Sequence, residues 1–261
     1  MQWGYHIHDL RATINWALSA MPKIILYDFP SREPCAAWLP SAWKARMALN
    51  YKKIDYETQW VEYPDVAPLA KSLGIPPGEG PGLPYTIPIM TTAGGEHIMD
   101  SKKIVDYLEE HYAPPDYPSL HLDSPILARV TEQMPGIMQR WASSVLYPLV
   151  PRNLLNPRSA EYYERTRKGF FGISLEEFGR QKSGEAWAEL DATWGGLAAL
   201  LRATEGPYFM GDIVSYADLQ LVAILHWAKR ADVSVFERLV AFEPAFRMIY
   251  EAAAPLVEQD T

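Results

Sequence analysis

Two neighbouring runs, YTIPIM at residues 85–90 and DSKKIVDYLEEHY at residues 100–112, carry most of the information about the fold. The apolar runs TIPIM and EHIMD are separated by TTAGG, whose glycines are typical of a turn, so they predict a β-hairpin. In the second run Ile104, Val105 and Leu108 fall on one helical face. The pair of runs therefore predicts a strand, a second strand and a helix in that order.

Upstream of the hairpin, alternating patterns predict two further strands and two helices. KIILYDF is rich in β-branched residues and is closed by Pro30, DYETQWVEY alternates polar and aromatic residues, and two segments have helical spacing. The expected elements are a strand at 23–28, a helix at 41–52, a strand within 55–63, a short helix at 67–74 and a loop at 75–85. The order βαβα, then ββα, is that of an α/β domain.

The second half of the chain has helical periodicity only. A proline-rich joint, APPDYPSLHLDSP, separates it from the first half. Helices are expected at 126–150, 160–182, 184–205, 216–231 and 234–258. The predicted organisation is an α/β domain at 21–113 and an all-α domain at 124–258, preceded by an extension at 1–20 that is either an amphipathic arm or lies upstream of a natural start at Met21.

Composition narrows the possible partners and the compartment. The 261 residues carry a net charge of −8, with 24 Lys and Arg against 32 Asp and Glu, and the basic residues are scattered. This charge disfavours nucleic acid and anionic membrane surfaces. One cysteine, no zinc-type spacing and no apolar run of membrane-spanning length predict a cytoplasmic, metal-free protein that does not enter the membrane.

Pro88 and the pair Asp100-Ser101 are the first candidates for chemistry. Proline inside a strand removes a hydrogen-bond donor, so one alternative is that Pro88 lies on an edge strand. The other is a cis bond between Ile87 and Pro88, which turns the N–H and C=O of Ile87 outward, where an extended peptide could pair with them. Asp100 and Ser101 either cap a helix or, with its free N–H groups, form part of an anion site.

Taken together, these features resemble a cytosolic glutathione S-transferase, and especially the fungal etherase-like branch. The resemblance covers residues 21 to about 255 and is carried by LYDFPS, WKARMALNYKKIDYETQWVEYPD, YTIPIM and DSKKIVDYLEEHY. It implies a thioredoxin-like first domain, an all-helical second domain, a homodimer and bound glutathione. It also implies that Ile87, beside Pro88, holds the cysteinyl backbone of glutathione, while Asp100 and Ser101 hold its γ-glutamyl end.

A second mark of the family, GDIVSYADL, gives Ser215 and Asp218 the spacing of a capping box with a structural role.

The group that activates the glutathione thiol is open in the sequence. Serine-type relatives carry a hydroxyl residue where this chain has Leu39, directly before Pro40. Ser41 at the start of the predicted helix and Tyr27 at the end of the first strand are the candidate catalytic residues, although an N-cap role and a core role fit them as well. Cys35 is a third candidate, through a mixed disulfide.

The acceptor pocket is expected between the two domains, with one wall on the first long helix of the second domain. Residues Met134, Ile137, Met138 and Trp141 recur there at helical spacing, a pattern that also fits a core stripe, and Pro135 interrupts the helix. Phe29 and Trp38 are expected on the opposite wall. Methionines and a flat indole suit a hydrophobic, unsaturated small molecule.

Two classes of function follow. The first is a glutathione-dependent transferase or cis/trans isomerase in secondary metabolism, with conjugation, isomerisation and ether cleavage as candidate reactions. The second is a non-catalytic carrier or regulatory protein in which Leu39 marks a lost hydroxyl. Ionisation of the bound thiol distinguishes the two.

Overall fold

A four-stranded sheet forms the centre of the first half of the chain. The computed structural model describes residues 23–79 and 82–259, so the predicted extension at 1–20 lies outside the described residues. The strands are β1 (Ile24–Asp28), β2 (Tyr56–Trp60), β3 (Ile89–Thr91) and β4 (His97–Met99), in the order β2-β1-β3-β4. β1 pairs in parallel with β2 and antiparallel with β3, and β3 pairs antiparallel with β4. The predicted order of these elements along the chain and the predicted hairpin are confirmed.

The helices of this half begin and end where local chemistry places them. α2 (Pro40–Tyr51) starts with a proline in its first turn, and α4 (Ser101–His111) starts after Asp100, whose side chain accepts two backbone N–H groups. The one-turn η1 (Tyr63–Asp65) leads into α3 (Val66–Ser72), which ends just before Gly74 at φ +72°.

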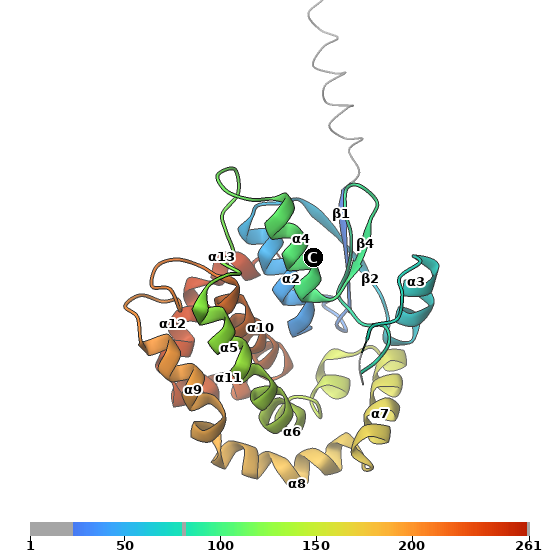
Figure 1. Ribbon diagram of the computed structural model, residues 1–261. Helices are drawn as coiled ribbons and strands as arrows, with labels where there is room; N and C mark the ends of the chain where they lie inside the picture. Colours follow the sequence, from blue (N-terminus) through green and yellow to red (C-terminus); the bar gives the residue numbers. More distant parts are fainter. Residues whose placement is uncertain (1–22, 80–81, 260–261) are drawn as a thin grey trace, which may run out of the picture.

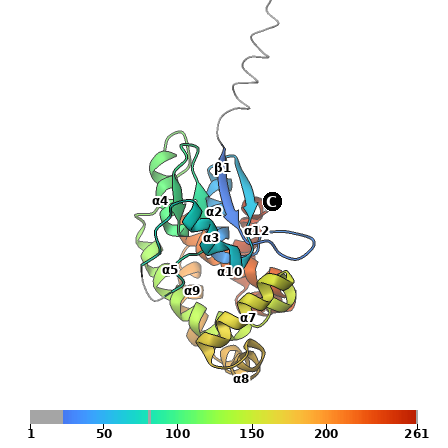
Figure 2. The same ribbon diagram turned by 90° about the vertical axis from the view of Figure 1, so that its right-hand side faces the viewer.

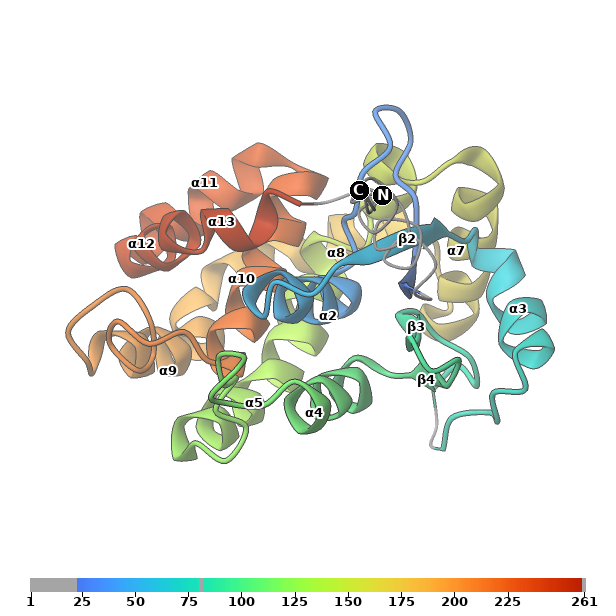
Figure 3. The same ribbon diagram turned by 90° about the horizontal axis from the view of Figure 1, so that it is seen from above.

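The sheet separates α3 from the other two helices. α2 and α4 pack against each other on the side that faces the helical half, and α3 lies on the opposite side (Figure 3). Ile104, Val105 and Leu108, the residues of the predicted apolar face of α4, are all fully buried. This βαβ–ββα arrangement confirms the thioredoxin-like domain.

The second half is helical and packs against α2 through α10 and α13. Its elements are α5 (Pro125–Gly136), the π-helical turn η2 (Ile137–Ala142), α6 (Ser143–Val145), the π-helical turn η3 (Val150–Leu154), α7 (Pro157–Phe171), α8 (Leu175–Ala188), α9 (Leu190–Arg202), α10 (Tyr216–Ala231), α11 (Val233–Phe242), α12 (Pro244–Ala252) and α13 (Ala254–Val257). In Figures 1 and 2, α7 and α8 form an arc along the side of the molecule away from the sheet, and α10 runs through the middle. Among the described residues no helix is both long and apolar enough to cross a membrane.

Several predicted helix lengths were wrong because turns interrupt the periodic segments. The helix expected at 160–182 is two helices, since Gly172 ends α7 at φ +76° and Ser174 caps α8. The one expected at 126–150 ends at Val145, and the one expected at 234–258 is broken before Pro244 and again near Ala253. The helix at 216–231 has the predicted bounds.

The central helix α10 connects the two halves. Its capping box is present as predicted: the Asp218 carboxylate accepts hydrogen bonds from the Ser215 N–H and Oγ, both at 2.7 Å, and from the Phe209 N–H at 2.8 Å. α10 packs along α2. α2 is therefore held against the helical half by a helix that is buried along all of its length except at Lys229 and Arg230.

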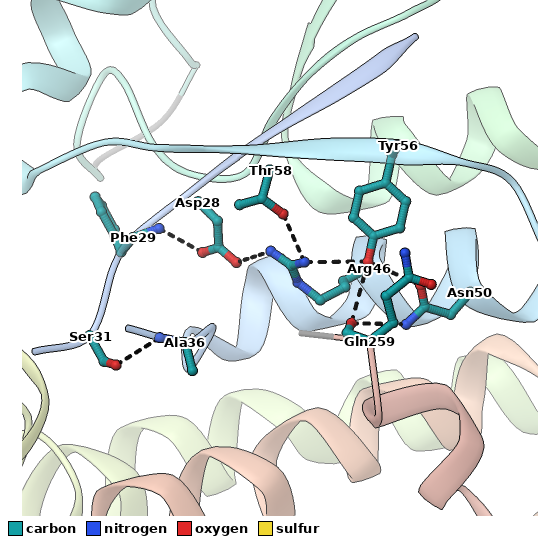
Figure 4. Close-up of polar contacts among 9 residues, drawn as sticks. All are labelled: Asp28, Phe29, Ser31, Ala36, Arg46, Asn50, Tyr56, Thr58 and Gln259. Atoms are coloured by element: carbon teal, nitrogen blue, oxygen red, sulfur yellow. Dashed lines mark hydrogen bonds and ion pairs between the residues drawn. The ribbon is translucent and has the colours of Figure 1, made fainter. Parts of the chain in front are cut away.

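A buried polar network fixes the end of β1 to α2 (Figure 4). Arg46 of α2 pairs with Asp28 of β1 at 3.1 Å, and neither side chain is exposed to solvent. Arg46 also donates to the Thr58 hydroxyl at 3.0 Å, and Asp28 accepts the Phe29 N–H at 2.7 Å. Burial raises the pKa of Asp28 to about 6, against the opposing effect of Arg46. These contacts hold the strand end and the helix that border the candidate site.

Candidate active site

A cavity of about 290 Å³ lies between the start of α2 and the helical half. Its lining is mainly apolar and aromatic, with a few polar and cationic side chains. The lining residues are Trp38, Leu39, Pro40, Ser41, Lys44, Tyr63, Met134, Met138, Tyr147, Tyr163, Arg167, Gln220, Ala223, Ile224 and Trp227. A concave, mostly apolar space with few polar groups is typical of a small-molecule site.

A second cavity, of about 220 Å³, adjoins the first on the side of the sheet. Ile87 and Phe29 line only this second cavity, whereas Leu39, Tyr63 and Arg167 line both. The three shared residues therefore mark a junction between the space beside Ile87 and the space between the two halves.

The Ile87–Pro88 bond is cis, the second of the two alternatives for this proline. The Asp100 N–H donates to the Pro88 carbonyl at 3.3 Å, which ties this turn to the start of α4. The Ser41 hydroxyl donates to the Ile87 carbonyl at 3.1 Å. Ser41 thus contacts the backbone of the residue predicted to hold glutathione.

Asp100 and Ser101 lie outside both cavities. The Asp100 Oδ1 accepts the N–H groups of Lys102 and Lys103, so the capping role is present. Asp100 also lines a third cavity, of about 720 Å³, on the side of β4. Ser101 is buried and interacts with the Tyr216 side chain of α10. Asp100 still acts on the larger cavity, because its charge raises the pKa of Lys44, although burial of the amine is the larger effect and lowers that pKa overall.

The three candidate thiol activators occupy different places. Ser41 lines the larger cavity. Tyr27 is buried in the core on β1 and lines neither cavity, because every residue of β1 is buried or nearly so between helices and neighbouring strands. Cys35 is half-buried in the loop before α2 and also lies outside both linings.

The start of α2, whose residues Leu39, Pro40 and Ser41 line the larger cavity, has backbone donors without an intrahelical partner. The first helical bond runs from the Trp43 N–H to the Leu39 carbonyl, and Leu39 at the N-cap has no capping side chain. The N–H groups of Ser41 and Ala42 therefore precede the first intrahelical bond, at the positive end of the helix dipole. The amine of Lys44 lies in the same lining.

Two of the four residues predicted for the acceptor wall on the first long helix line the larger cavity. Met134 and Met138 line the larger cavity, whereas Ile137 and Trp141 are fully buried in the core, where Trp141 packs edge-on against Trp194 at 5.1 Å. The two pairs follow different faces of the helix, which continues past Pro135 through a π-helical turn instead of stopping. Ile137 and Trp141 therefore belong to the core and not to the acceptor wall.

The opposite wall is an aromatic stack. Phe29 and Tyr63 lie face to face with ring centroids 3.7 Å apart, and Trp38 packs 6.3 Å from Phe29. Trp38 lines the larger cavity and Phe29 the smaller. Both residues were placed on this wall from the sequence, while Tyr63 was not considered.

Sequence reasoning missed the contribution of α7. Tyr163 and Arg167 project from this helix into the larger cavity, and the guanidinium carbon lies 3.9 Å from the centroid of the Tyr163 ring. The spacing of four residues on a predicted helix places an aromatic and a cation on one face, and this signal was available in the sequence. Tyr147 was missed because it follows the end of α6, within a segment predicted as continuous helix.

Comparison with known proteins identifies the family. Residues 40–111 match the family description "Glutathione S-transferase, N-terminal domain", and residues 135–237 match "Glutathione S-transferase, C-terminal domain". A glutathione transferase from Phanerochaete chrysosporium, GSTFuA3, is 30% identical with a TM-score of 0.77, over 93% of this chain and all of that one. The chain belongs to the glutathione S-transferase family.

Three further relatives show the range of the family around this chain. A glutathione S-transferase of Ceriporiopsis subvermispora, solved in complex with glutathione, is 30% identical with a TM-score of 0.70, over 87% of this chain and 97% of that one. The glutathione S-transferase-like protein ustS of Aspergillus flavus is 29% identical over 85% of this chain and 86% of its own. A probable maleylacetoacetate isomerase of Caenorhabditis elegans is 27% identical, covering 82% of each chain.

The residues of the site fit glutathione as cofactor. The tripeptide carries an amine, two carboxylates, peptide groups and a thiol. Asp100 offers a carboxylate whose Oδ2 is not used in capping, Ile87 offers main-chain groups beside a cavity, and the start of α2 with Lys44 offers positive potential. Among the described residues no three His, Cys, Asp or Glu side chains gather as a metal site.

Proposed function

We propose that this chain is a glutathione-dependent transferase or cis/trans isomerase that acts on a hydrophobic, unsaturated small molecule in secondary metabolism. The observation that carries the proposal is the pair of adjoining cavities. One lies beside Ile87, the other is lined by Met134, Met138 and Trp227, and the start of α2 lies between them. Bound glutathione would supply a thiolate nucleophile, which conjugation, isomerisation and ether cleavage all need.

The protein groups that would lower the thiol pKa differ from those of serine-type relatives. Leu39 has no hydroxyl, and the proton of the Ser41 hydroxyl is donated to the Ile87 carbonyl. We assign thiolate stabilisation to the free N–H groups at the start of α2 and to Lys44, because both place positive charge on the cavity. Ser41 then acts by positioning Ile87.

The test is a titration with glutathione in which calorimetry reports binding and ultraviolet absorbance reports the thiolate, repeated across pH. The bound thiol should ionise at lower pH than free glutathione. Lys44→Met should raise its apparent pKa by about one unit, since a nearby cation is lost. Lys168→Met, on the exposed face of α7, is the matched control and should leave it unchanged.

Ser41→Ala separates the two explanations of thiol activation. If Ser41 positions Ile87, the variant should weaken glutathione binding and leave the pKa of the bound thiol nearly unchanged. A rise in thiol pKa as large as that of Lys44→Met would instead make the hydroxyl the activator and refute the assignment to the helix end.

A non-catalytic carrier is the second candidate, and one observation favours it. Leu39 gives no hydroxyl at the usual position, and the nearest one, on Ser41, already donates to Ile87. A carrier would bind glutathione with no thiolate signal and would bind apolar compounds without altering them. Chromatography with mass analysis of the acceptor, after incubation with protein and glutathione, distinguishes the cases. Conjugation gives a heavier product, isomerisation a product of the same mass with a different retention time, and ether cleavage gives fragments. A carrier leaves the acceptor unchanged.

We also propose that the protein is a homodimer in the cytoplasm. The support is the family membership and the resemblance noted in the sequence. Light scattering coupled to gel filtration tests the assembly, with a mass near twice 29.6 kDa expected. A monomeric mass at all concentrations would refute it, and imaging of a tagged chain tests the compartment.

A further inference from the structure

We propose that Arg167 binds a negatively polarised oxygen of the acceptor, either an ionised acid or the carbonyl that ends a conjugated system. The inference rests on the proposed function, in which the acceptor occupies the larger cavity. It narrows the substrate class from any hydrophobic unsaturated molecule to one that carries such an oxygen.

Arg167 lies where the two cavities meet. It projects from α7, is half-buried, and lines both cavities together with Leu39 and Tyr63. A group held there would be at the end of the larger cavity nearest Ile87, whereas the apolar body of the ligand would extend toward Met134 and Met138.

The surroundings of Arg167 contain phenols but no counter-ion. Its Nη1 donates to the Thr166 hydroxyl at 3.0 Å, and its guanidinium lies over the rings of Tyr163 and Tyr63. The guanidinium charge also acts to lower the pKa of Tyr147, although burial raises that pKa overall. Within residues 23–79 and 82–259, no carboxylate lies within 4 Å of Arg167.

The residues that line the two cavities do not neutralise the charge of Arg167. Neither cavity is lined by any Asp or Glu, although the chain has 32 acidic residues and a net charge of −8. Lys44 is the other cation of the larger cavity, and it lies on α2. A guanidinium presents several donors in a planar fork that matches carboxylate and carbonyl oxygens, and it binds them more strongly where water is excluded.

Arg46 is a contrasting case within the same structure. Arg46 also stacks near aromatic rings, at 5.6 Å from Trp43 and 5.5 Å from Tyr56, yet it is neutralised by Asp28. Arg167 has no such carboxylate partner within the described residues, so guanidinium donors beyond the one bonded to Thr166 remain available to a ligand at the junction of the cavities.

Two matched pairs of probes test the proposal without glutathione. 8-Anilinonaphthalene-1-sulfonate and N-phenyl-1-naphthylamine share a skeleton and differ in the anionic group, and their own fluorescence reports binding. trans-Chalcone and trans-stilbene are similar in shape and differ in the conjugated carbonyl, and their binding is measured by displacement of N-phenyl-1-naphthylamine. The proteins are wild type, Arg167→Met, Arg167→Lys and, as matched control, Arg165→Met, which removes an exposed arginine of the same helix outside both linings.

Arg167→Met should weaken the sulfonate, the chalcone or both by about tenfold or more, and change the naphthylamine and stilbene by less than twofold. Loss of the sulfonate alone indicates an acid as the natural group, and loss of the chalcone indicates a carbonyl. Arg167→Lys should recover part of the sulfonate affinity. Arg165→Met should bind all four probes as wild type does, and near-ultraviolet circular dichroism should show all variants folded.

Three results would overturn the inference. These are equal changes for all four probes, no change for any, and failure of the wild type to bind them. A loss of glutathione affinity by calorimetry with unchanged probe binding would do the same, because it would assign Arg167 to the tripeptide. Because the probe measurements omit glutathione, a chain that fails to bind glutathione would refute the proposed function and leave this result standing.

Discussion

His226 should make the protein lose stability as the pH falls below neutrality. This residue of α10 is buried, its Nδ1 lies 2.9 Å from the Tyr250 hydroxyl, and its ring packs 4.4 Å from the Trp43 ring. Burial lowers the pKa of His226 to about 3, with a further contribution from the charges of Arg230 and Lys229. The folded protein therefore keeps a neutral imidazole through the range in which an exposed histidine would be protonated.

The magnitude follows from the difference in proton binding. The unfolded chain binds a proton at His226 below about 6.5, whereas the folded chain binds it only below about 3. Between these values the unfolded state holds more protons, so stability rises with pH across this window and falls on acidification. At about 1.4 kcal/mol per pH unit, lowering the pH from 7 to 5 should cost about 2 kcal/mol through His226 alone.

His226→Gln removes this titration and keeps a polar group able to bond with Tyr250. Urea unfolding, followed by tryptophan fluorescence at pH 5 and pH 7, gives the pH-dependent loss of unfolding free energy for each protein. The loss should be smaller by about 2 kcal/mol in His226→Gln than in wild type. His111→Gln, at an exposed histidine, is the control and should keep the wild-type loss. Equal losses in His226→Gln and wild type would refute the reasoning.

Three further predictions concern buried and binding carboxylates. Asp218→Ala removes three hydrogen bonds at the start of α10. It should lower the unfolding free energy, measured in urea, by about 2–4 kcal/mol, which is more than the loss of an ordinary cap. A loss below about 1 kcal/mol would mean that water replaces the carboxylate. Arg46→Met leaves Asp28 buried without a partner and should lower the unfolding free energy by about 3–5 kcal/mol in the same urea curves. Adding Asp28→Leu should restore most of this loss. If the losses of the two single variants add in the double variant, the reasoning is wrong. Asp100→Asn keeps an oxygen to cap α4 and should still weaken glutathione binding by about 1.5–3 kcal/mol in calorimetry, which unchanged affinity would disprove.

The first half of the chain was predictable because its signals are local. The TTAGG turn and Asp100 at a helix start each depend on a few neighbouring residues, and both have the predicted structure. The cis bond before Pro88, inside an apolar run, is one of the two alternatives that the sequence left open. The capping box of α10 is local in the same sense. A strand order that follows from hairpins and short crossovers needs little more than these signals.

The helical half was less predictable because periodicity does not report where a helix bends or stops. Gly172 and Pro244 end helices inside segments that the pattern treats as continuous. The stripe from Met134 to Trp141 divides between cavity and core only because a π-helical turn follows Pro135 and a second tryptophan packs on Trp141. Such a division depends on tertiary packing, which one sequence does not contain.

The replacement of serine by Leu39 is the point where sequence and structure together say more than either alone. From the sequence, Leu39 suggests a lost function, and Ser41 suggests a replacement two residues further on. In the structure the Ser41 hydroxyl donates to the Ile87 carbonyl, and so supports the backbone beside the cavity. The leucine side chain cannot cap α2, which leaves the N–H groups of Ser41 and Ala42 free. Under the function proposed above, the uncapped helix start would stabilise a thiolate together with Lys44, so a leucine in place of the serine is compatible with catalysis.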